Sequence, residues 1–342
     1  MSWQIIMRPQ DNTLCGVRNF RLVALLIALS TSALGQEATL AVVEKISGSV
    51  GFYSADGRRV GGVEVSTHPH EMILSPDKRF LYVTDNGILW MTHAGEGGNT
   101  ISIIDVAARR KVGVIDLGNY RRPHGIDVDP RSGLLAVTIE NPDGLLLVDP
   151  FERKVLKKYD VGGEDPHMVL LEPGAEWAYV SNTGSGTLAA LRLKTAEVIP
   201  ISSGPRPQGG VFSPDGKTIY LTNSGGDSIS VFDVPRKERA GTIQTGRGPV
   251  RIALTPDGKT LVYGLQSGKA VGFADVTSGK EVSQIPLGGP AVSLTMSSDG
   301  RIAYCSVQEQ DKIFVISVND RKVLRVIQTP KGSGPDPVIP LP

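Results

Sequence analysis

Histidine is the side chain in this sequence best suited to chemistry, and its positions follow a pattern. The chain contains five histidines, and three of them directly follow a proline: His70, His124 and His167. The other two are His68 and His93. Neutral imidazole binds transition metals, and it exchanges protons near neutral pH. A fold that brings these rings together would therefore create a candidate metal site or acid–base site.

Arginines occur beside the same kind of proline. Arg122 precedes Pro123, Arg206 precedes Pro207, and Arg251 lies two residues after Pro249. Planar guanidinium groups suit carboxylate and phosphate ligands. We therefore predict a ligand-binding set made of His70, His124, His167, His93, Arg122, Arg206 and Arg251. The predicted partner on the face that carries these residues is a protein or a small anionic ligand.

These prolines recur along the chain at regular intervals. Prolines 123, 166, 207, 249 and 290 are separated by 41 to 43 residues, while Pro69 and Pro337 open the first and last units at longer intervals. Each unit contains four short apolar stretches bounded by turn residues such as the Pro-Asp-Gly that begins at residue 214. This spacing and these turns are typical of four-stranded propeller blades, and no segment has a convincing helical period.

The two ends of the chain supply complementary parts of one unit. Residues 41–44, 49–53 and 60–66 have the pattern of the second to fourth strands, and residues 337–341 have that of a first strand. Joined, they make a seventh blade, which removes the open sheet edges that invite aggregation. The prediction is an all-β fold over residues 36–342, namely a seven-bladed β-propeller of four-stranded blades closed by a blade shared between the N- and C-termini.

Three segments resemble the YVTN repeat: residues 81–86 (LYVTDN), 178–182 (AYVSN) and 219–223 (IYLTN), the last followed by SISVFDV. The resemblance extends from about residue 38 to the C-terminus. It implies a seven-bladed β-propeller of the kind usually exported by bacteria and archaea, often without known activity. The same superfamily includes lactonases similar to 6-phosphogluconolactonase and the propellers of cytochrome d1 and nitrous oxide reductase. Because one fold serves many functions, function has to be argued from the site.

In a propeller the first strand of each blade lines the central channel. The residue after each opening proline should therefore surround the channel mouth, which predicts a ring of His70, His124, His167, Gln208, Val250, Ala291 and Val338. Residues 85–99 form a longer loop on the same face, and this loop carries Trp90, Met91 and His93. Loops of this length without secondary structure often carry a binding site.

Three functions fit these residues. The first is a binding module whose ligand or partner occupies the histidine-bearing face. The alternative is a lactonase-like hydrolase that uses histidine and arginine at the channel mouth, although no catalytic residue is assigned by the resemblance. The second alternative is a propeller that binds a transition metal, with His70, His124 and His167 as candidate ligands. No C-x-x-C-H motif is present, which excludes covalent c-type haem.

The N-terminal residues have the composition of an export signal. An apolar run at 22–29 follows three arginines, and the small residues that end at Gly35 suit cleavage. We predict a signal peptide over residues 1–35, starting at Met1 or Met7, and a periplasmic or extracellular protein without a membrane span after cleavage. Cleavage would leave Cys305 as the only cysteine, so no disulfide within the chain is expected. The net charge of +1 and the absence of a basic stripe argue against nucleic-acid binding.

Overall fold

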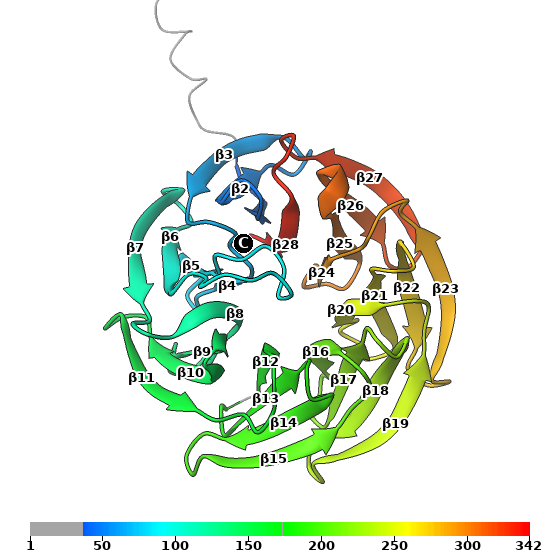
Figure 1. Ribbon diagram of the computed structural model, residues 1–342. Helices are drawn as coiled ribbons and strands as arrows, with labels where there is room; N and C mark the ends of the chain where they lie inside the picture. The colour runs from blue at the N-terminus through cyan, green and yellow to red at the C-terminus, as the bar shows by residue number, and fades with distance from the viewer. Residues whose placement is uncertain (1–36, 173) are drawn as a thin grey trace, which may run out of the picture. The chain divides into compact units, whose positions relative to one another are not determined.

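The computed structural model describes residues 37–172 and 174–342, which form seven four-stranded antiparallel sheets arranged in a ring (Figure 1). This confirms the predicted seven-bladed β-propeller. The predicted signal peptide lies outside the described residues. The described part of the chain has no helix with the length and apolar character needed to cross a membrane.

In each of blades 1 to 6, four consecutive strands run from the channel to the outer surface. Blade 1 contains β4(Met72–Leu74), β5(Phe80–Asp85), β6(Thr100–Asp105) and β7(Arg110–Asp116). Blade 2 contains β8(Arg121–Val128), β9(Leu135–Asn141), β10(Asp143–Asp149) and β11(Lys154–Tyr159). Blade 3 contains β12(Pro166–Leu171), β13(Trp177–Asn182), β14(Thr187–Arg192) and β15(Glu197–Ser202).

The next three blades repeat this order. Blade 4 contains β16(Pro207–Phe212), β17(Thr218–Asn223), β18(Ser228–Asp233) and β19(Glu238–Gln244). Blade 5 contains β20(Pro249–Leu254), β21(Thr260–Leu265), β22(Ala270–Asp275) and β23(Lys280–Pro286). Blade 6 contains β24(Ser293–Met296), β25(Ile302–Val307), the 3₁₀ turn η1(Gln308–Gln310), β26(Lys312–Ser317) and β27(Lys322–Gln328).

Blade 7 is built from both ends of the chain, as predicted. Its strands are β28(Pro335–Pro340), β1(Leu40–Glu44), β2(Ser49–Tyr53) and β3(Arg59–Glu64), in that order across the sheet. The prediction that Pro337 opens this blade is wrong, because β28 already begins at Pro335. Val338, predicted at the channel mouth, instead pairs with Val42 and is buried in the core between blades 6 and 7.

The core lies between neighbouring blades. The second strand of a blade is almost entirely buried, as in β9, whereas the outermost strand β11 is largely exposed. Leu135, Val137 and Ile139 of β9 pack with Ile101 and other residues of blade 1 in one apolar cluster. Apolar burial of this kind supplies most of the stability of the ring.

The first strand of most blades carries a β-bulge just after its opening proline. In β12, for example, Pro166 pairs with Asn182 and Val169 with Val180, so two residues, His167 and Met168, lie opposite Ser181 alone. Irregularities at the same place occur in β8, β16, β20 and β28. A bulge twists the strand locally and redirects a side chain. Here the redirected positions are those nearest the channel mouth.

A hydroxyl on the second strand secures each of several bulges. The Thr138 hydroxyl accepts the N–H of Gly125 at 2.8 Å and donates to the carbonyl oxygen of His167, in the next blade, at 2.8 Å. Thr84 makes the same contact with the His124 carbonyl at 2.8 Å, and Ser306 with that of Asp336 at 2.6 Å. Gly125 has no room for a side chain, because an added Cβ would lie 2.6 Å from the His167 oxygen.

We predict that Thr138→Val destabilises the protein by about 1–3 kcal/mol, because valine keeps the shape and leaves a buried N–H and a buried carbonyl unpaired. Equilibrium urea unfolding measures the loss. Thr138→Ser is the control, since serine keeps the hydroxyl and should recover most of the lost stability. A valine variant as stable as the original protein would contradict a structural role for this hydrogen bond.

Candidate functional site

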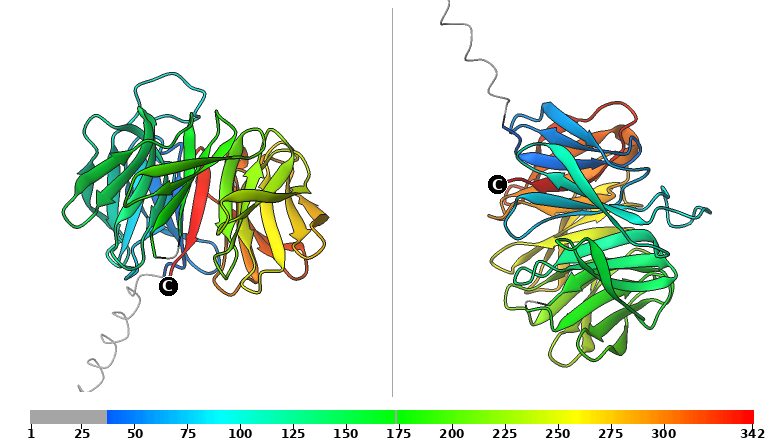
Figure 2. Two further views of the ribbon diagram at one scale, coloured as in Figure 1. Left: turned by 90° about the horizontal axis from the view of Figure 1, so that it is seen from below. Right: turned by 90° about the vertical axis from the view of Figure 1, so that its left-hand side faces the viewer.

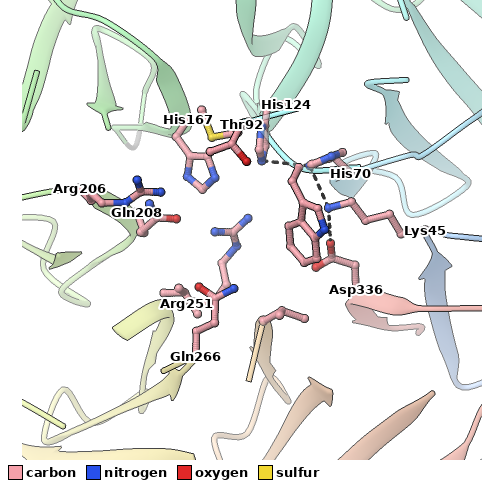
Figure 3. Close-up of a pocket in the computed structure, with 14 residues that line it drawn as sticks. Lys45, His70, Thr92, His124, His167, Arg206, Gln208, Arg251, Gln266 and Asp336 are labelled. Atoms are coloured by element: carbon pink, nitrogen blue, oxygen red, sulfur yellow. Dashed lines mark hydrogen bonds and ion pairs between the residues drawn. The ribbon is translucent and has the colours of Figure 1, made fainter. Parts of the chain in front are cut away.

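A cavity of about 190 Å³ opens at the channel mouth, and residues from all seven blades line it (Figure 3). Its lining combines histidines, cations, amides and one acid. The residues are Lys45, His70, Trp90, Met91, Thr92, His124, His167, Arg206, Gln208, Val250, Arg251, Gln266, Val292 and Asp336. Five predicted site residues therefore meet here: His70, His124, His167, Arg206 and Arg251.

The three proline-linked histidines form a ladder along the cavity wall. The ring centroids of His70 and His124 are 4.3 Å apart, and those of His124 and His167 are 4.2 Å apart, each pair packing edge to face. All three residues are buried, with exposed fractions of 4%, 2% and 5%. Each ring comes from the start of a different blade: His124 and His167 lie in the bulges of β8 and β12, and His70 lies just before β4. The ladder therefore crosses two blade boundaries.

Two of the histidines are held by specific partners. His124 Nδ1 lies 2.8 Å from Glu140 Oε1, and its Nε2 lies 3.2 Å from His70 Nδ1. The other nitrogen of His70, Nε2, donates to the carbonyl oxygen of Ile88 at 2.8 Å. His167 differs, because its Nδ1 is buried and has no hydrogen-bond partner in the described structure. The His167 residue also lines the cavity.

Burial keeps these histidines neutral. It lowers the pKa of His70, His124 and His167 well below the ordinary value of 6.5, and the nearby Lys45 and Arg251 add to the effect at His124. Burial also raises the pKa of the Glu140 carboxyl, although the Arg122 guanidinium opposes this. The positive charge of the cavity therefore comes from lysine and arginine.

Two of these cations, Lys45 and Arg251, are each paired with a carboxylate. Lys45 Nζ lies 3.0 Å from Asp336 Oδ2 and 3.3 Å from His70 Nδ1. The Arg251 guanidinium donates to the Glu71 carboxylate. Burial disfavours the charged form of Arg251, but the Glu71 and Asp336 carboxylates together outweigh this effect and raise the pKa of Arg251. The Arg206 side chain, by contrast, is exposed at the rim.

The long loop after β5 covers one side of the cavity, and in Figure 2 it projects from one face of the propeller. His70 holds it through the Ile88 carbonyl, and the Trp90 ring lies 5.1 Å from Lys45 Nζ. Arg122 donates to the carbonyl oxygens of His93 and Gly95, each at 2.8 Å. The loop is thus fixed by residues of the site.

The remaining predicted residues lie beside the cavity. The His93 side chain is exposed on the loop, and Arg122 binds that loop and the Glu140 carboxylate at 3.4 Å. His68 contacts the Lys45 carbonyl at 3.3 Å. Within residues 37–172 and 174–342, no group of three or more His, Cys, Asp or Glu side chains is arranged to hold a metal ion. The geometry gives the transition-metal alternative no support.

Two charged lining residues were absent from the predicted ring. Asp336 occupies the place assigned to Val338, and the signal for it was the dipeptide Gly334-Pro335, which matches Gly248-Pro249 of blade 5. Lys45 directly follows the second strand of blade 7, where Gln266 stands in blade 5. The predicted Ala291 is buried in the core, and its neighbour Val292 lines the cavity.

We predict that His167→Gln weakens the dependence of stability on pH. Because the folded pKa of His167 is depressed, its contribution is present above pH 6.5 and is lost as pH falls below that value. Replacement should reduce the slope of unfolding free energy against pH by up to about 1.4 kcal/mol per unit below pH 6.5. Glutamine suits this position, since Gln208 occupies it in blade 4.

Urea unfolding of both proteins at several pH values between 7.5 and about 5 tests this. Burial raises the pKa of Asp85 and of Asp127 to about 6, and these carboxyls make both proteins more stable as the pH falls. The effect of His167 is therefore the difference between the pH profiles of the variant and the original protein. Parallel pH profiles would contradict the assignment.

Comparison with known proteins agrees with the fold and gives one family match. Residues 211–280, in blades 4 and 5, match the family model described as "Lactonase, 7-bladed beta-propeller". That segment includes Arg251 and Gln266 but none of the histidines. No curated protein matches the sequence significantly.

Solved structures share the architecture at low sequence identity. A functionally unknown protein from Desulfotomaculum acetoxidans has a TM-score of 0.73 and 16% identity, covering 89% of this chain and 99% of its own. The periplasmic gluconolactonase of Pseudomonas aeruginosa has a TM-score of 0.71 and 16% identity, with the same coverage. Dihydro-heme d1 dehydrogenase NirN has a TM-score of 0.64 and 15% identity, covering 86% of this chain and 64% of its own. The chain is a seven-bladed β-propeller similar over one segment to the lactonase propellers.

Proposed function

We propose that the protein binds a small hydroxylated organic anion, such as an aldonate or a uronate, in the cavity at the channel mouth. The observation that carries this proposal is the lining itself. Three cations, Lys45, Arg206 and Arg251, face a cavity that contains one acidic lining residue, Asp336. Guanidinium groups recognise carboxylates through paired hydrogen bonds.

The neutral lining residues suit the hydroxyl groups of such a ligand. Gln208, Gln266 and Thr92 supply amide and hydroxyl groups, and His167 Nδ1 is an unpaired buried nitrogen. Trp90 offers an apolar surface against which the carbon face of a sugar can pack. A few polar groups around a partly apolar cavity are usual for small-molecule sites.

Export from the cytoplasm belongs to the same proposal. The N-terminal sequence favours it, and the gluconolactonase with the same fold is periplasmic. The binding site would then meet ligands outside the cytoplasm.

Arg206→Gln should weaken gluconate binding at least tenfold, because a hydrogen bond to a charged group contributes about 1.5–3 kcal/mol. Isothermal titration calorimetry measures the affinity. The Arg206 side chain is exposed, so the variant should keep the stability of the original protein. Arg301→Gln is the control, since Arg301 is also exposed and lies outside the cavity lining. Equal affinity in the Arg206 variant, or no binding of gluconate or galacturonate at all, would contradict the proposal.

A second candidate function is hydrolysis of an aldonolactone, whose product is the anion just described. The lactonase match and the His124–Glu140 pair, at 2.8 Å, favour it. Water would add to the lactone carbonyl as the His167 imidazole accepts its proton, and the cations would stabilise the oxyanion. The ring C–O bond would then break, and the ring oxygen would take the proton held by His167 to become a hydroxyl, which restores the neutral imidazole.

Proton release from glucono-δ-lactone in a pH-stat tests this candidate. The protein should raise the rate above spontaneous hydrolysis, and His167→Gln should remove the increase while the protein stays folded by circular dichroism. No increase over the spontaneous rate would exclude lactone hydrolysis of this substrate and leave the binding proposal standing.

A further inference from the structure

A second cavity adjoins the first and shares part of its wall. It has a volume of about 330 Å³, and Trp90, Gln266 and Val292 line both cavities. Gln308, Ser267 and Pro290 complete much of its surface. Trp90 therefore stands between the two spaces. The indole is held on the side of the first cavity. Its ring lies 5.1 Å from Lys45 Nζ, and its loop is anchored by the hydrogen bond from His70 to the Ile88 carbonyl.

The chemistry of the second cavity differs from that of the first. Its wall combines apolar surface from Trp90, Pro290 and Val292 with neutral polar groups from Gln266, Gln308 and Ser267. Its charged residues, Lys269 and Glu309, are of opposite sign. An apolar face beside amides and a hydroxyl fits a neutral sugar ring, whose C–H faces are apolar and whose edge carries hydroxyls.

One buried atom in this cavity lacks a partner. Gln308 is 3% exposed, and its side-chain nitrogen makes no hydrogen bond in the described structure. Buried polar groups are rarely left unpaired, because the lost hydrogen bonds to water are not replaced. His167 Nδ1 is the corresponding unpaired atom in the first cavity. Each cavity is thus lined by a residue whose side chain has an unpaired buried nitrogen.

We propose that the second cavity is a subsite for a neutral sugar linked to the acidic unit bound in the first cavity. The ligand is then an acidic disaccharide or a longer chain, which passes Trp90 and places a hydroxyl against the Gln308 amide. This inference rests on the proposed anion-binding function and specifies its ligand.

Calorimetric titration with two probes tests the subsite: gluconate, and lactobionate, in which galactose is linked to gluconate. We expect lactobionate to bind at least tenfold more tightly than gluconate. Gln308→Met, a change of similar shape, should remove most of that advantage and leave gluconate affinity unchanged. Gln208→Met is the matched control, because Gln208 lines only the first cavity and its loss should weaken both probes alike.

Ser267→Phe provides a second variant at an exposed position of the same wall, and filling the subsite there should have the same selective effect as Gln308→Met. Gluconate binding without an advantage for lactobionate, or an advantage that survives both variants, would overturn the subsite alone. Failure of both probes to bind would overturn the subsite together with the anion-binding proposal.

Discussion

The contact between a second-strand hydroxyl and the first strand of the next blade determines the geometry of the channel mouth. Thr84, Thr138, Thr222 and Ser306 each donate to the carbonyl of a residue beside or at the cavity in the following blade. In blades 1 and 2 the same hydroxyl, of Thr84 or Thr138, also accepts a backbone N–H from the inner edge of its own blade. The donor is Glu71 in blade 1 and Gly125 in blade 2. A single buried hydroxyl thereby joins a first strand to its neighbour, and its polar groups are satisfied in the process.

This contact explains how His124 and His167 come to lie edge to face. The carbonyls of His124 and His167 are anchored by Thr84 and Thr138, so the backbones of these two residues are held in equivalent positions in neighbouring blades. The rings then pack in a setting that excludes water, which disfavours their protonated forms. Neutral imidazoles leave the attraction of anions to Lys45, Arg206 and Arg251, and they can accept as well as donate hydrogen bonds. The result is a positively charged cavity with uncharged groups available for hydroxyl recognition.

The repeat made the fold predictable because its signals are local. Pro-Asp-Gly turns, alternating strands and regular proline spacing each specify a short segment, and their agreement gave the blade count and the shared seventh blade. His70, His124, His167, Arg206 and Arg251 were predictable for the same reason, since each follows or flanks an opening proline. Asp336 was missed because two prolines stand close together at the C-terminus, and the bulge decides which one opens the blade. Lys45, Gln308 and the position of Trp90 depend on side-chain packing between blades, which has no local signature.

The ion pair between Lys45 and Asp336 joins residues that are 291 positions apart, one on each terminal segment of blade 7. Both are also walls of the cavity. Completion of the ring and completion of the site are therefore one event, and a chain with an open seventh blade has no intact cavity. By thermodynamic linkage, any ligand that requires both residues favours the closed ring. A bound ligand would stabilise the pairing of the two terminal segments in blade 7. A propeller that has lost its last strand would be unable to hold its ligand.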